Sequence, residues 1–208
     1  MKNCLRKFKI FKNGFTLAEV LITLVIIGVI AAMTIPTLIN NTKQKQYIVA
    51  WRKSFSEFAQ ALLLIKANGD SFDNVTSVGD KLMGYMRAKP CITDDINYKI
   101  YHYDGSGHYD KLSDYSRCLS LENGTHIGIT ANIVLFDVNG STKPNQIGKD
   151  IFFALVDKNN FKLNPAVGYK NGWGAADGIL ENPTSGNGTC QAADQGRGCS
   201  AWYLLHDK

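Results

Sequence analysis

The chain has 208 residues, of which 45% are hydrophobic and 20% are charged, and this composition excludes a wholly disordered protein. Its formal net charge of +5 is confined to residues 1–14, which hold five basic side chains and no acid, whereas the rest of the chain carries 18 basic and 18 acidic side chains. A general nucleic-acid-binding surface is not expected, because such a surface needs excess positive charge.

An apolar run follows the basic segment, from Phe15 to Ile39, and holds a single charged residue, Glu19. As a helix it would extend about 37 Å, enough for a bilayer core of about 30 Å. The flanking positive charge predicts a single-pass inner-membrane protein with a cytoplasmic N-terminus and an extracytoplasmic body, first held in membrane lipid. A cleaved secretory signal and a plain membrane anchor are alternatives, although a secretory signal normally has a shorter apolar part, about 7–15 residues.

Two features distinguish this run from a plain anchor. Glu19 lies inside it, and a buried acid costs about 2.5–3.5 kcal/mol at the centre of a membrane helix, so a partner for the carboxylate is expected. The alternative is that Glu19 reaches the membrane interface, because it lies near the start of the run. The second feature is Gly14, a small residue between the basic leader and Phe15 that would fit a narrow protease pocket.

The sequence KNGFTLAEVLI at residues 12–22 resembles the type IV prepilin signal, shared by type IV pilins and type II secretion pseudopilins. The resemblance covers about residues 1–40 and implies cleavage between Gly14 and Phe15 by a prepilin peptidase, followed by N-methylation of Phe15. Residues 1–14 would then be a cleaved leader, residues 15–39 a membrane and filament-core helix, and residues 40–208 an amphipathic helix with an extracytoplasmic head.

The resemblance also gives the apolar helix a role in assembly. In a filament, Glu19 of one subunit would meet the Phe15 amine of a neighbour, and an unpaired charge there would be costly, so Glu19 would set the register. Gly28 and Ala32 would allow close helix approach. Pro36 removes a backbone donor and is expected to kink or locally melt the helix.

The rest of the chain predicts an α+β, pilin-like head. Apolar residues recur every three or four positions between residues 40 and 66, which predicts a continuing helix that ends at the Asn68-Gly69 turn. A short helix is expected over residues 78–88. Five strands are expected, over residues 97–103, 125–130, 133–138, 150–157 and 161–163, with a last strand over residues 201–205. Helix followed by strands implies an antiparallel sheet packed on the long helix.

The loop DVNGSTKPNQIGKD, residues 137–150, has two interpretations. It is either a turn built on Asx side-chain hydrogen bonds or a calcium loop that uses the oxygens of Asp137, Asn139 and Asp150. The loop lacks the third acid and the closing Glu of an EF-hand, so no cofactor is expected apart from this calcium candidate.

Four cysteines remain after loss of the leader: Cys91, Cys118, Cys190 and Cys199. An even number in an oxidising compartment predicts two disulfides, and three pairings are open. The pairs Cys91–Cys118 and Cys190–Cys199 are favoured because they close the shorter loops. A zinc site is the alternative, although the chain has no Cys-x-x-Cys pair.

No catalytic motif is present, and we expect a structural subunit rather than an enzyme. The expected partners are other copies and related pilin-like subunits, the prepilin peptidase and methylase, and an inner-membrane assembly platform with its ATPase. The filament would be a periplasmic type II secretion pseudopilus or a cell-surface type IV pilus. The alternatives are a filament-displayed binding module, such as an adhesin or DNA-uptake minor pilin, and a single-pass enzyme whose leader matches by chance.

Overall fold

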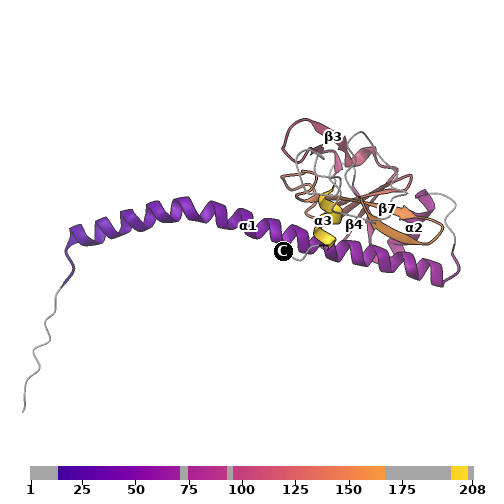
Figure 1. Ribbon diagram of the computed structural model, residues 1–208, viewed down its shortest axis with the longest axis horizontal. Coiled ribbons are helices and arrows are strands. Elements are labelled where there is room, and N and C mark those ends of the chain that lie inside the picture. The colour runs from indigo at the N-terminus through magenta and orange to yellow at the C-terminus, as the bar shows by residue number, and fades with distance from the viewer. Residues whose placement is uncertain (1–13, 71–74, 93–95, 167–197, 206–208) are drawn as a thin grey trace, which may run out of the picture. The chain divides into compact units, whose positions relative to one another are not determined.

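The computed structural model describes residues 14–70, 75–92, 96–166 and 198–205 (Figure 1). The chain divides into two compact units, residues 1–42 and 43–208. One helix, α1 (Leu17–Ala67), contributes its first part to the first unit and its second part to the second.

The first part of α1 is uncovered by its own chain. From Leu17 to Ile39, its large hydrophobic side chains are between 43% and 79% exposed. By length and composition this stretch can cross a membrane. Helix α1 continues without interruption through Pro36, so the helix is not locally melted at this residue. The kink at Pro36 stays a prediction.

The second unit is an α+β head built on an antiparallel sheet, which confirms the predicted fold class. The strand order is β1-β4-β5-β6-β7-β8, and every neighbouring pair is antiparallel. The strands are β1 (Lys89–Pro90), β4 (Arg117–Ser120), β5 (His126–Thr130), β6 (Ile133–Asp137), β7 (Ile151–Asp157) and β8 (Lys162–Pro165). A second helix, α2 (Val75–Met86), precedes the sheet.

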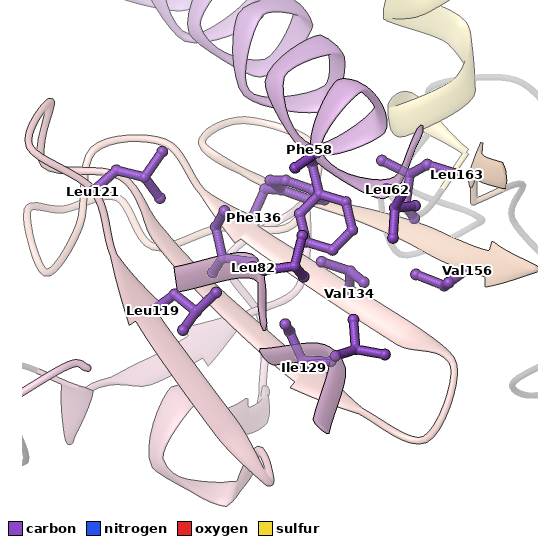
Figure 2. Close-up of a cluster of buried hydrophobic side chains, with 14 of the residues drawn as sticks. Phe58, Leu62, Leu82, Leu119, Leu121, Ile129, Val134, Phe136, Val156 and Leu163 are labelled. Atoms are coloured by element: carbon purple, nitrogen blue, oxygen red, sulfur yellow. The ribbon is translucent and has the colours of Figure 1, made fainter. Parts of the chain in front are cut away.

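Alternation along the strands separates two hydrophobic clusters. Val134 and Phe136 of β6 and Phe152 of β7 belong to the cluster that faces the helices, whereas Leu135 and Phe153 belong to the cluster on the other face. Figure 2 shows Phe58 and Leu62 of α1 and Leu82 of α2 packed against side chains of the sheet. The predicted apolar stripe of α1 is therefore the face that covers the sheet.

The second cluster is closed by a smaller sheet and a helical turn. Strands β2 (Lys99–Tyr101) and β3 (His108–Lys111) pair with each other, and the short helix η2 (Leu112–Asp114) follows. The tyrosine-rich run at residues 97–103 was expected to form a strand, and its strand belongs to this separate pair rather than to the main sheet.

The C-terminal segment differs from the prediction, because residues 201–205 belong to a helix, α3 (Cys199–Leu205), instead of a strand. Strand β7 already has β6 and β8 as neighbours and offers this segment no free edge. The segment docks through Ser200: its Oγ accepts a hydrogen bond from the Phe153 amide (2.8 Å), and its carbonyl accepts one from Trp51 Nε1 (3.0 Å). The Trp51 ring also stacks on Phe152 at 5.1 Å.

Helix α1 ends where its turn residues predicted. Gly69 adopts a φ of +74°, which a residue without a Cβ tolerates, and its amide bonds to the Lys66 carbonyl at 3.1 Å. The Asp70 amide bonds to the Ile65 carbonyl at 3.2 Å. These two hydrogen bonds satisfy backbone carbonyls in the last turn of α1 and terminate the helix.

Candidate functional site

The predicted cleavage junction lies just before helix α1, in non-helical backbone at residues 14–16. The Phe15 side chain is 87% exposed, and a Cβ added to Gly14 would meet no atom within 4 Å. Packing in the part of the chain that the structure describes therefore gives no reason for a glycine at this position. A protease requires an exposed peptide bond outside regular secondary structure, so this geometry is compatible with cleavage after Gly14.

Glu19 lies in the first turn of α1 and forms a capping box with Thr16. The Thr16 amide and hydroxyl each donate to Glu19 Oε2 at 2.8 Å, and the Glu19 amide donates to Thr16 Oγ1 at 3.3 Å. Within a single chain, the partner of the Glu19 carboxylate is therefore Thr16, at the start of the same helix. Sequence reasoning missed this pattern, although Thr-x-x-Glu before an apolar run predicts it.

Packing among the described residues gives Gly28 no structural role, since a Cβ there would meet nothing within 4 Å. Ala32 is exposed in the same stretch of α1. Their predicted role between subunits therefore has no competing explanation inside the described residues.

The loop between β6 and β7 brings the three calcium candidates together. Asp137 and Asp150 are both 0% exposed. The Asn139 amide donates to Asp137 Oδ1 at 3.3 Å, while its side-chain amide lies close enough to Asp150 to lower that residue's pKa. The amides of Asn145 and Gln146 donate to the two oxygens of Asp150 at 2.8 and 2.7 Å.

Two tyrosines complete this cluster, and the sequence analysis missed both. The Tyr98 hydroxyl donates to Asp137 Oδ2, and Asn139 Nδ2 donates to the Tyr47 hydroxyl at 3.4 Å. Tyr47 lies on α1, within the range whose apolar spacing predicts a continuing helix, and Tyr98 lies just before β2. Their roles depend on long-range contacts that no local motif encodes.

Burial dominates the electrostatics of the two acids. It raises the pKa of Asp137 well above its usual range, and the neighbouring Asp150 raises it further. Burial likewise raises the pKa of Asp150 to about 6, against backbone hydrogen bonds from Gln146 and Asn145 that lower it. Among the described residues, no lysine or arginine forms an ion pair with either acid. The cluster therefore favours a bound proton or a cation.

The oxygen chemistry of the cluster fits a hard cation in part. Asn139 Oδ1 is buried and has no hydrogen-bond partner, which leaves a third side-chain oxygen beside the two carboxylates. Calcium takes about six to eight oxygens, and the described residues contain no group of three acids, histidines or cysteines around one point. The Asx-turn interpretation of the loop is directly visible in the Asp137 and Asp150 hydrogen bonds.

The structure contains the first of the two disulfides that loop closure favours, Cys91–Cys118. Cys91 and Cys118 form a disulfide with a Cα–Cα distance of 5.3 Å, which joins the residue after β1 to β4. Cys199, at the start of α3, is also disulfide-bonded. Its predicted partner Cys190 lies outside the described residues.

Comparison with known proteins identifies the N-terminal segment. Residues 11–35 match the family model described as the prokaryotic N-terminal methylation motif. No curated protein and no solved structure matches the chain. The chain therefore carries, on a pilin-like α+β architecture, the N-terminal methylation motif that is the signature of type IV pilins and pseudopilins.

Proposed function

We propose that this chain is a filament subunit, trimmed after Gly14 and N-methylated at Phe15, that assembles through the first part of α1 into a type II secretion pseudopilus or a type IV pilus. Before assembly, this stretch anchors the protein in the inner membrane with the head outside.

The observation that carries the proposal is the uncovered apolar helix behind the methylation motif. Among the described residues, the window of α1 that is apolar enough to cross a membrane is 0% buried. Such a surface is stable in water only when lipid or other subunits cover it. A filament core made of the same helix from many copies provides that cover after the subunit leaves the membrane.

Glu19 is proposed to set the axial register of that core. Cleavage after Gly14 creates a charged amine on Phe15, next to Thr16, whose amide and hydroxyl already hold the Glu19 carboxylate. The carboxylate is therefore fixed at the level of the new amine, where a neighbour shifted along the filament can offer its own Phe15 amine. In a water-poor core, leaving either charge unpaired costs several kcal/mol, about 3–5 for a broken buried pair.

The test compares Glu19→Ala with Glu57→Ala in cells that make the filament. Glu57 is a partly exposed acid on the same helix that pairs with Lys53 at 3.7 Å, and it serves as the control. We expect both variants to be trimmed, but only Glu19→Ala to be lost from sheared filaments. Filaments of the Glu19→Ala protein at the level of the unsubstituted chain would refute the register role.

Calcium binding by the loop that holds Asp137, Asn139 and Asp150 is a secondary proposal. It is supported by the two buried acids and the unpaired Asn139 oxygen.

A second candidate function, a head displayed on the filament to bind a ligand, is supported by the open cavity beside β2 that lies on the head.

A further inference from the structure

A cavity of about 390 Å³ opens on the head where β2 meets the loop between β6 and β7. The two segments are joined by hydrogen bonds from the Tyr101 amide to the Asn145 carbonyl at 2.8 Å, and from the Ile147 amide to the Tyr101 carbonyl at 3.0 Å. The cavity is therefore walled by paired backbone, and its volume falls in the range of small-molecule sites, about 300–1,000 Å³. Its main lining residues are Tyr98, Lys99, Tyr101, Lys143, Asn145 and Gln146.

The lining of this cavity combines positive charge with aromatic rings. Lys99 and Lys143 supply two ammonium groups, and neither forms an ion pair with a described residue. No described acidic side chain lines the cavity. Two fully buried acids contact residues that line it: Asp137 accepts a hydrogen bond from the Tyr98 hydroxyl, and Asp150 accepts from the backbone amides of Asn145 and Gln146. An oxyanion on a ligand would thus meet two cations that have no competing partner.

Two amide side chains among the lining residues, Asn145 and Gln146, add hydrogen-bonding capacity. Asn145 is 5% exposed, and its side-chain oxygen has no hydrogen-bond partner. Gln146 presents its side-chain amide beside Gly105, where an added Cβ would lie 2.8 Å from Gln146 Nε2. Gly105, with a φ of +81°, thus leaves room for that amide at the cavity wall. A buried polar group without a partner costs about 1–3 kcal/mol, which a ligand hydroxyl would recover after a small side-chain movement.

We propose that this cavity is a binding site for an acidic saccharide, a ligand that carries a carboxylate on a hydroxyl-rich ring. The carboxylate is matched by Lys99 and Lys143, the hydroxyls by Gln146, Asn145 and the Tyr101 phenol, and the apolar face of the ring by the tyrosines. This site lies wholly in the head and does not depend on which filament the subunit joins, so its failure would leave the assembly proposal standing.

The test is calorimetric titration of the detergent-solubilised full chain with trigalacturonate, and with galactotriose as the neutral probe. We expect saturable binding of trigalacturonate that weakens with added salt, and at least about tenfold weaker binding in Lys99→Gln/Lys143→Gln. Lys162→Gln, which alters a lysine of β8 outside the cavity, is the control and is expected to bind like the unsubstituted chain.

Three results would overturn the proposal. The first is no saturable binding of trigalacturonate up to about 10 mM, the weakest affinity at which such a site would be useful. The second is equal affinity for the two trisaccharides, or equal affinity of the double variant and the Lys162→Gln control. The third is tighter binding of a short DNA duplex than of trigalacturonate, which would assign the two lysines to nucleic acid instead.

Discussion

Replacement of Asp150 by Asn tests whether the two buried acids bind a proton or a cation. Asp150 has a pKa of about 6 in the folded head and about 3.8 when unfolded. Because its folded pKa is raised, its favourable contribution to folding is complete below about pH 4 and is lost as the pH rises through 6. A shift of this size corresponds to about 3 kcal/mol of unfolding free energy, at 1.36 kcal/mol per pH unit.

The assay is urea unfolding of the detergent-solubilised chain between pH 4 and 7.5, followed by tryptophan fluorescence with Trp51 in the core. We expect the difference in stability between Asp150→Asn and the unsubstituted chain to move by about 3 kcal/mol in favour of the variant as the pH rises. The variant also loses a hydrogen bond from the backbone, and this loss lowers its unfolding free energy equally at pH 4 and at pH 7.5. The change of the stability difference with pH is therefore the informative quantity.

Asp104→Asn provides a control of opposite sign. Hydrogen bonds from the Ser106 hydroxyl and amide lower the pKa of this exposed acid, so its contribution is present at neutral pH and is lost as the pH falls. A difference curve for Asp150→Asn that is flat, or that slopes like that of Asp104→Asn, would refute the raised pKa. If calcium instead holds both acids ionised, adding it at pH 7 stabilises the unsubstituted chain and leaves Asp150→Asn unchanged.

Two further predictions concern the head. Trp51→Ala removes a ring that stacks on Phe152 and bonds to Ser200, so we expect a loss of about 3–5 kcal/mol in urea unfolding, and a loss below 1 kcal/mol would contradict the packing. Thiol titration of the denatured, non-reduced mature chain is expected to find no free cysteine, because Cys91 and Cys118 are joined and Cys199 is disulfide-bonded; two free thiols would refute the second bridge.

The sequence predicts the features of this fold that depend on local pattern. The four- and three-residue spacing of Phe58, Leu62 and Ile65 predicts the buried face of α1, and the Gly69 turn predicts its end. The β5–β6 hairpin and β7 follow from short apolar runs bounded by turn residues. In each case, neighbours along the chain determine the structure.

Features that depend on distant contacts were missed or misassigned. Strand β4 lacks clear alternation and is held by β5 and by the Cys91–Cys118 bridge. The apolar residues 201–205 suit a strand or a helix, and Trp51 and Phe153 decide the outcome through Ser200. In the loop, the acids Asp137 and Asp150 are visible in the sequence, but their burial against Tyr98 and Tyr47 arises only when α1, β2 and the sheet come together.

The most direct test of the filament-subunit proposal is the mass of the N-terminal peptide of the protein purified from its native membranes. We predict a peptide that begins at Phe15 and carries one additional methyl group, and a Gly14→Leu variant that keeps residues 1–14. A native protein that begins at Met1, or a Gly14→Leu variant that is trimmed normally, would contradict processing at this junction and, with it, assembly through the first part of α1.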